Sequence, residues 1–326
     1  MRLAIAGTGI TGAYLFRLLK NAGIAAHLYD RRQWGGCGLK PCAWGTSADF
    51  VRLAEQAGLP GEKYILQRLD HLFMDDIRIR AEILTFDKPK LIADLVGDER
   101  IRFEPLPLDE YDRVIDATGV SRALLPAIEH DLLMDCRQYL VETAHPIETR
   151  IRLGGIGYAW RFPLSGNRYH TGCGSLLEDP RQILDRLGWL ESATPDNGQS
   201  ILCRCAGTIR LTGPHQSQPF VANGCEEGIW GVGEAIGCVA PLAGDGIVPG
   251  MRSVQLLLDS WDDPVRYRNA VLKEFSWMRD ERRVVDRVRN AQPLRIRDAL
   301  VLKNNSRRMD MKVRLKDAMV LLKNLR

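Results

Sequence analysis

The sequence lacks any long apolar run. No stretch of its 326 residues approaches the about 18 consecutive apolar residues that cross a bilayer. After Met1 and Arg2 the first apolar run already stops at Gly7, which is too short for the core of a secretory signal peptide. Charged residues make up 26% and hydrophobic residues 45%, as is typical of a soluble globular protein. We therefore expect a cytoplasmic protein built from one large or two interleaved domains.

Paired cysteine spacings are also missing. The eight cysteines are scattered, and neither Cys203 with Cys205 nor Cys37 with Cys42 has the CxxC spacing of zinc or iron–sulfur sites. We interpret them as reduced thiols and expect no bound metal.

Charge is unevenly distributed along the chain. Residues 279–326 contain 15 Lys and Arg against six Asp and Glu, whereas the remainder contains 30 against 35. A basic end on a mildly acidic body indicates an anionic partner, and we expect no nucleic acid among the partners. The spacing predicts amphipathic helices over Tyr267–Val288 and Met309–Arg326. The last helix either packs on its own domain, which we favour, or lies on anionic lipid as a peripheral membrane contact.

The first thirty residues carry the strongest pattern. The apolar run Leu3–Ala6 predicts a buried strand, which leads into a GxGxxG turn at residues 7–12 and a helix. A second apolar run, Ala25–Tyr29, ends on Asp30. Strand, glycine turn, helix, strand and acid within about thirty residues are the context that a dinucleotide-binding fingerprint requires.

Each residue of this fingerprint has a physical role. Gly7 permits the sharp turn, Gly9 lets a pyrophosphate approach bare backbone, and Gly12 lets the helix pack closely on the strand. The helix N-terminus offers unpaired N–H groups to the phosphates. Asp30 is placed to accept hydrogen bonds from a ribose hydroxyl. The turn alone leaves FAD and NAD both open.

A glycine-rich loop follows the second strand. Residues 31–45 contain several glycines and a proline, which exclude regular structure. The loop leaves the carboxyl end of a strand, where ligands of open α/β sheets lie. Its two Trp and two Cys indicate either a ligand site or a packed connector with buried thiols.

The middle of the chain changes in character. We expect a helix over 47–58, paired strands over 65–73 and 77–86, a helix over 89–97 and strands over 100–103 and 112–119. Residues 120–224 alternate apolar and polar positions with frequent turns, which predicts an antiparallel sheet inserted into the nucleotide-binding domain. The predicted fold class is therefore α/β with an inserted antiparallel β domain and C-terminal helices.

Three aromatic residues share one strand face within this middle region. Alternation places Tyr158, Trp160 and Phe162 on one side and Ala159 and Arg161 on the other. Such a stripe forms either the apolar wall of a site or an ordinary core face, and the second is the commoner meaning.

A second glycine turn follows a strand near residue 230. The segment Ile229–Gly237 is predicted to be a strand entering a turn that carries Glu234. Gly244, Gly246 and Ile247 then precede a helix that runs to about Trp261. The positive end of that helix would face the cleft and favour an anion, which in a flavoprotein is the N1/C2=O edge of the reduced ring.

Together these stretches resemble the geranylgeranyl reductase family of FAD-dependent oxidoreductases, which saturate isoprenoid chains. The N-terminal glycine turn with Asp30 is similar to its ADP-binding part. Residues 40–45 (KPCAWG) resemble its cysteine loop beside the flavin, and residues 158–163 (YAWRFP) resemble the YxWxFP signature that lines its prenyl tunnel. Residues 233–235 with 244–247 look like its last flavin motif. The resemblance covers residues 1–260, although Gly155 stands where the signature usually has proline and Glu234 where aspartate is commoner.

The resemblance implies FAD as the cofactor and a three-layer Rossmann-like domain of the glutathione reductase/hydroxylase type. It implies an FAD-binding domain of residues 1–50, 85–120 and 225–262, a substrate domain of residues 51–84 and 121–224, and a basic helical region of residues 263–326. The implied catalytic residues are Cys42, Tyr158, Trp160 and Phe162. The implied cofactor-binding residues are Gly7, Gly9, Thr11, Gly12, Asp30, Arg31, Cys42, Ala43, Gly45, Lys88, Thr118, Gly119, Glu234, Gly244, Gly246 and Ile247.

The implied activity is reduction of C=C bonds in geranylgeranyl chains, with a prenyl lipid as substrate and NADPH or ferredoxin as alternative electron donors. Cys42 is the expected proton donor or a residue that shapes the pocket, since a free thiol is mostly protonated at neutral pH. The alternatives are a flavin monooxygenase or halogenase on the same fold, and a non-catalytic nucleotide- or lipid-binding protein.

Overall fold

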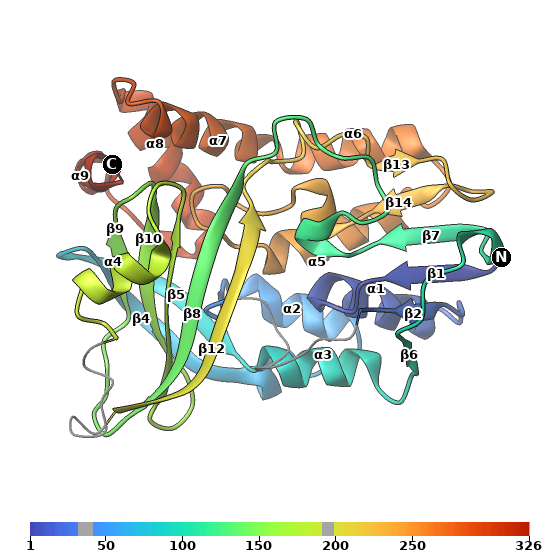
Figure 1. The fold of residues 1–326 in the computed structure, drawn as a ribbon, viewed down its shortest axis with the longest axis horizontal. Helices are drawn as coiled ribbons and strands as arrows, with labels where there is room; N and C mark the ends of the chain where they lie inside the picture. Colours follow the sequence, from blue (N-terminus) through green and yellow to red (C-terminus); the bar gives the residue numbers. More distant parts are fainter. Residues whose placement is uncertain (32–41, 191–198, 326) are drawn as a thin grey trace.

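The computed structural model describes residues 1–31, 42–190 and 199–325. It contains two β-sheets that lie side by side with helices around them (Figure 1). The first sheet has six strands in the described residues, in the order β13-β14-β7-β1-β2-β6. Strand β1 lies between β2 and β7 and runs parallel to both. The strands are β1 (Leu3–Ala6), β2 (His27–Tyr29), β6 (Ile101–Arg102), β7 (Arg113–Asp116), β13 (Val221–Ala222) and β14 (Ile229–Gly231).

The second sheet has nine strands among the residues that the structure describes. Their path is β12-β8-β11-β10-β9-β4-β5-β15, and β3 also pairs with β5. All neighbours are antiparallel except β4 and β9, which run parallel. The strands are β3 (Gly45–Thr46), β4 (Ile65–Met74), β5 (Ile77–Phe86), β8 (Leu133–Thr143), β9 (Arg150–Leu153), β10 (Gly157–Pro163), β11 (Arg168–Ser175), β12 (Gln199–Arg210) and β15 (Met311–Lys312).

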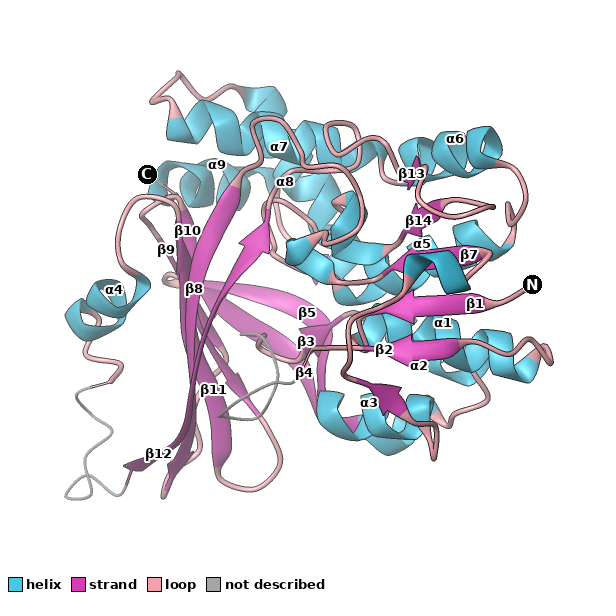
Figure 2. Ribbon diagram, turned by 45° about the vertical axis from the view of Figure 1, so that its right-hand side comes forward, coloured by secondary structure: helices cyan, strands magenta, loops and turns pink. Residues whose placement is uncertain are grey.

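Helices cover both sheets. Helix α1 packs against α3 and α5 beside the first sheet, and α2 also contacts α5. Helix α4 packs on β11 and β8, and Figure 2 shows it beside the second sheet and away from the first. The helices are α1 (Ile10–Asn21), α2 (Asp49–Gln56), α3 (Lys88–Val96), α4 (Pro180–Arg186), α5 (Ile247–Leu258), α6 (Pro264–Glu274), α7 (Ser276–Arg289), α8 (Ile296–Asn305) and α9 (Leu315–Asn324), with short 3₁₀ turns η1 (Gly61–Tyr64), η2 (Leu108–Glu110), η3 (Gly119–Ser121), η5 (Gly233–Ile236) and η6 (Ser306–Met309).

The second sheet is covered on both faces along its central strand β10. Alternation along β10 explains this, because Trp160 enters the core shared with the C-terminal helices while Ala159 enters a smaller core under α4. A third core surrounds the first sheet and includes α1, α3 and α5. None of the helices in the described residues is long and apolar enough to span a bilayer.

The predicted α/β class and most predicted elements are confirmed. The paired strands β4 and β5, helix α3 and the antiparallel strands β8 to β12 lie where the sequence places them. The division of the chain into domain ranges stays a prediction.

Two C-terminal helix predictions need correction. The helix predicted over Tyr267–Val288 is two helices that meet at Phe275. The helix predicted over Met309–Arg326 begins only at Leu315, since Met311 and Lys312 form β15 against β5. Burial there alternates with a period of two, which is the period of a strand.

Candidate functional site

The glycine turn between β1 and α1 leaves room that the protein does not fill. Gly7 has a φ of 101°, and a Cβ there would lie 2.3 Å from the Ala117 carbonyl oxygen. A Cβ at Gly12 would lie 1.9 Å from the Gly7 carbonyl oxygen, so close packing requires glycine at both positions. A Cβ at Gly9 would meet nothing within 4 Å, and Gly9 caps α1 without a side-chain hydrogen bond. The structure therefore holds an open backbone cradle at a helix N-terminus, which fits a phosphate.

Asp30 lies beside this cradle at the end of β2. The Thr8 backbone N–H donates to one oxygen of its carboxylate at 2.7 Å, and the Thr8 hydroxyl donates to the same oxygen at 2.5 Å. The backbone N–H of Arg31, an exposed residue, donates to the other oxygen at 2.7 Å. These bonds fix the carboxylate at the rim of the turn, and its predicted contact with a ribose stays a prediction.

The end of β7 closes the other side of the turn. The buried Asp116 carboxylate accepts hydrogen bonds from the Thr118 N–H at 3.0 Å and the Thr118 hydroxyl at 2.6 Å. It also accepts from the backbone N–H groups of Leu124 and Leu125, at 2.9 and 3.0 Å. Asp116 thereby sets the turn that begins η3, where Thr118 and Gly119 lie.

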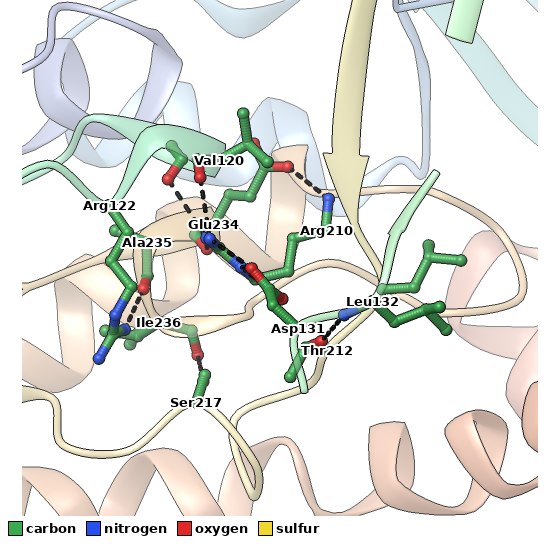
Figure 3. A network of polar contacts seen from close by, with 12 residues as sticks. Val120, Arg122, Asp131, Leu132, Arg210, Thr212, Ser217, Glu234, Ala235 and Ile236 are labelled. Carbon is green, nitrogen blue, oxygen red and sulfur yellow. Dashed lines mark hydrogen bonds and ion pairs between the residues drawn. The ribbon is translucent and has the colours of Figure 1, made fainter. Parts of the chain in front are cut away.

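Arg210 connects η3 and η5 with the end of β12 (Figure 3). Its guanidinium donates to the Asp131 carboxylate, with a shortest separation of 2.9 Å, and to the Val120 and Glu234 carbonyl oxygens at 2.8 Å each. The Arg210 backbone N–H donates to the Glu234 carboxylate at 2.8 Å. Glu234 is therefore held by protein contacts on both its side chain and its backbone.

Arg122 makes a second set of contacts around η5, all to carbonyl groups. Its guanidinium donates to the Ala235 carbonyl oxygen, to that of Pro126 at 2.6 Å and to that of Pro219 at 2.7 Å. Burial, with a smaller effect from the nearby charge of Arg210, lowers the pKa of Arg122 to about 10. The two arginines thus connect the turns η3 and η5 through hydrogen bonds.

A cavity of about 660 Å³ lies between the second sheet, the segment that leads into α5 and the C-terminal helices α7 to α9. Tyr158, Trp160 and Phe162 all line it, and Trp160 and Phe162 also belong to the apolar core on that side of the sheet. The Trp160 indole N–H donates to the Gln138 side-chain oxygen at 3.3 Å. A Cβ at Gly172 would lie 2.4 Å from the Trp160 ring, so this glycine gives the indole its place on the sheet.

The cavity also reaches the segment that leads into α5. The Tyr158 hydroxyl donates to the Ala243 carbonyl oxygen, and a Cβ at Gly244 would lie 2.7 Å from that hydroxyl. The predicted residues that line the cavity are Cys42, Ala43, Gly45, Tyr158, Trp160, Phe162, Gly244, Gly246 and Ile247. The structure thus brings the cysteine loop, the aromatic wall and the last glycine motif to one cavity.

The other predicted residues do not line the cavity, although the charge of Lys88 acts on Asp245 of its wall. Thr11 packs against Gly233 and Gly250, where Cβ atoms would come within 2.8 and 2.5 Å of its hydroxyl. Lys88 begins α3. Gly7, Gly9, Gly12, Asp30, Arg31, Thr118, Gly119 and Glu234 border the turns described above. Lys40 and Pro41, the first two residues of the cysteine motif, lie outside the described residues.

Trp44 fixes the cysteine loop to the second sheet. It has a φ of 57°, and its ring meets that of His170 edge-on with centroids 4.6 Å apart. Burial lowers the pKa of His170 to about 4, so the imidazole is neutral at physiological pH. The loop that carries Cys42 is therefore anchored through an uncharged contact to β11.

Two buried carboxyl groups of the cavity are missing from the predicted site. Burial raises the pKa of Asp245 to about 6, although the Ile247 N–H donates to it at 3.0 Å. Burial raises the pKa of Glu281 on α7 to about 7. A sequence signal for Glu281 exists, because it occupies an apolar-stripe position of α7 together with Met278, Val285 and Val288.

Comparison with known proteins shows which solved structures share the fold of this chain. No protein-family model matches the chain. The uncharacterized protein MJ1182 of Methanocaldococcus jannaschii is 24% identical over 351 residues, which cover 91% of this chain and 93% of that protein. A geranylgeranyl bacteriochlorophyll reductase-like protein from Thermoplasma acidophilum gives a TM-score of 0.71 at 15% identity and covers 98% of this chain and 95% of its own. PqsL of Pseudomonas aeruginosa, a probable FAD-dependent monooxygenase, gives a TM-score of 0.61 at 16% identity over 99% of each chain. The fold implied by the sequence resemblance is confirmed.

Proposed function

We propose that this chain is an FAD-dependent oxidoreductase that reduces C=C bonds of geranylgeranyl chains, with a prenyl membrane lipid as substrate. The observation that carries the proposal is the single cavity in which the YxWxFP aromatics and the Gly244–Ile247 turn meet. Its volume of about 660 Å³ falls in the usual range of sites that enclose an organic ligand.

The described residues fit FAD. The open cradle at Gly9 would receive the pyrophosphate, and Asp30 at its rim would accept a ribose hydroxyl. The N-terminus of α5, where Gly246 and Ile247 line the cavity, would favour the negative edge of the reduced ring. When bound, reduced flavin supplies the hydride for the reaction.

The side chains of the protein would bind the substrate and limit its contact with water. The aromatic wall would hold a prenyl chain by apolar burial, and its π faces tolerate positive charge that develops at a tertiary carbon. Part of the remaining wall is aliphatic and would limit the contact of water with the reacting bond. These aliphatic residues include Ile83, Ile151, Leu153, Ile209, Leu242, Leu302, Val313, Leu321 and Leu325.

A flavin monooxygenase or halogenase is the second candidate, because PqsL shares the fold over nearly the whole chain. The two candidates differ in their need for oxygen. The protein should be loaded with FAD, reduced chemically without oxygen and incubated with a geranylgeranyl lipid. We expect mass spectrometry to find product heavier by two hydrogens per reduced bond. Unchanged lipid, together with oxygen-dependent modification of an aromatic compound, would favour the second candidate. No flavin uptake at all would favour a non-catalytic binding protein.

A further inference from the structure

Glu281 stands out among the cavity-lining residues because it is a carboxyl group at the centre of a helix. It lies on α7 and is only 4% exposed. Its neighbours on the same stripe, Met278 and Val285, belong to the apolar cores. Burying a carboxyl group among such residues costs free energy, so its presence calls for a functional explanation.

The position of Glu281 is fixed at the end of the cavity where the flavin ring is proposed to lie. The Leu242 backbone N–H donates to its carboxylate at 3.1 Å. The next residue, Ala243, accepts the hydrogen bond from the Tyr158 hydroxyl. The carboxyl group and the aromatic wall are therefore fastened to adjacent residues of the segment that enters α5.

Glu281 forms no ion pair with the described residues around it. Within residues 1–31, 42–190 and 199–325, no basic side chain lies within salt-bridge distance of it. Arg308 of η6 is the nearby cation and lowers its pKa slightly, while its guanidinium lies 4.9 Å from the centre of the Trp277 ring. Arg282, the next residue on α7, pairs with Asp286. Asn305 of α8 lies beside the carboxyl, and Asp245 is the other buried acid of the cavity.

We propose that Glu281 is the proton donor of the alkene reduction, an inference that rests on the proposed function. One alkene carbon gains a hydride with its two electrons, which leaves reduced flavin oxidised. The π electron pair forms the second C–H bond with the carboxyl proton of Glu281. The O–H bond breaks and leaves a carboxylate, which regains a proton from water.

Two other groups of the cavity suit this role less well. Asp245 accepts the Ile247 N–H at the N-terminus of α5, where the helix dipole favours a carboxylate over a protonated acid. Cys42 is the donor expected from the sequence, yet a thiol is ordinarily a weaker acid than a carboxyl group. Burial raises the pKa of Glu281 to about 7, which keeps about half of it protonated at neutral pH.

The test compares Glu281→Gln with Glu226→Gln, which makes the same chemical change at an exposed residue outside the cavity and should leave the rate unchanged. The full chain, loaded with FAD and reduced without oxygen, is mixed with a geranylgeranyl glycerol ether phosphate in a single turnover. We expect E281Q to bind FAD normally and to form product at least about a hundredfold more slowly. The wild-type rate should fall as pH rises through about 7, and that fall should be absent in E281Q. Glu281→Asp should restore part of the rate.

A second measurement is independent of activity. Infrared difference spectra of the flavin-free protein should show a protonated carboxyl that titrates near neutral pH and is missing in E281Q. An E281Q protein with the wild-type rate, or with a lower rate and an unchanged pH profile, would overturn the proposal, as would the absence of that carboxyl signal. If the wild type itself leaves the lipid unsaturated, the proposed function fails, and the role of Glu281 fails with it.

Discussion

Arg210 and Glu234 are joined twice, once through each residue's backbone. The Arg210 N–H donates to the Glu234 carboxylate at 2.8 Å, and the Arg210 guanidinium donates to the Glu234 carbonyl oxygen at 2.8 Å. Because Arg210 ends a strand of the second sheet, this pair connects that sheet to a glycine turn of the first. Glu234 is a predicted cofactor residue, so the second sheet helps to set the geometry of the proposed FAD site.

Replacing Arg210 by methionine should destabilise the protein strongly. The change removes the Arg210 donor from the Asp131 carboxylate and the Val120 carbonyl oxygen, and one of two donors from the Glu234 carbonyl oxygen, which still accepts from the Gly237 N–H. We expect a loss of about 3–5 kcal/mol in the free energy of unfolding, measured with urea. The control is Arg204→Met at an exposed position of the same strand, which should change stability by no more than about 0.5 kcal/mol. Equal losses in both variants would contradict the role assigned to Arg210.

Two glycine variants should separate folding from cofactor binding. A methyl group at Gly9 meets open space, whereas one at Gly12 collides with the Gly7 carbonyl oxygen. Gly9→Ala should therefore keep the wild-type melting temperature but bind FAD at least about tenfold more weakly, because the cradle is filled. Gly12→Ala should lower the melting temperature even without flavin. Flavin titration and thermal unfolding measure the two effects, and normal FAD affinity in Gly9→Ala would place the pyrophosphate elsewhere.

The sequence predicted those features that depend on local spacing. The glycine turn and the strand alternation at 158–162 were both accessible because their periods and conformations are set by neighbouring residues. The end of α6 at Phe275 could not be predicted in this way, because the apolar spacing continues across the break between the two helices. Arg210 was not found either. Its partners Asp131 and Val120 are about eighty to ninety positions away, and nothing local reveals such contacts.

Replacing Cys42 by alanine tests the role that the family resemblance implies for this residue. The thiol lines the cavity with the aromatic wall, and it is free. We expect Cys42→Ala to spare FAD binding and to reduce turnover, because the thiol lines the pocket beside the proposed ring. Rapid-mixing rates of flavin reoxidation with prenyl lipid give the answer. Unchanged turnover would make Cys42 a lining residue only.

Stability should depend on pH in a way that identifies Glu281. Its pKa rises from 4.5 to about 7 on folding, so the folded state binds a proton more tightly than the unfolded state. The resulting stabilisation is fully present below about pH 4.5 and is lost as pH rises through about 7. Relative to E281Q, the wild type should lose up to about 3 kcal/mol between these limits. Urea unfolding at several pH values measures this difference, and parallel curves for the two proteins would contradict the burial effect.

The basic C-terminal helices lead to a prediction about membranes. Helix α9 buries Ala318, Leu321 and Leu322 in the core, as the packed interpretation of its stripe expected. Its exposed side still carries Lys316, Lys323 and Val320. We propose that this side meets an anionic membrane surface, where each lysine near the lipid contributes about 1 kcal/mol.

Vesicle sedimentation tests this contact. Binding should require anionic lipid, weaken as salt is raised, and decrease at least about tenfold in the double variant Lys316→Glu/Lys323→Glu. The control Arg268→Glu/Lys273→Glu makes the same charge change at exposed positions of α6 and should bind as the wild type does. Equal binding to neutral vesicles would show that electrostatic attraction does not contribute. Equal losses in both double variants would show that the net charge of the protein matters and the position of α9 does not.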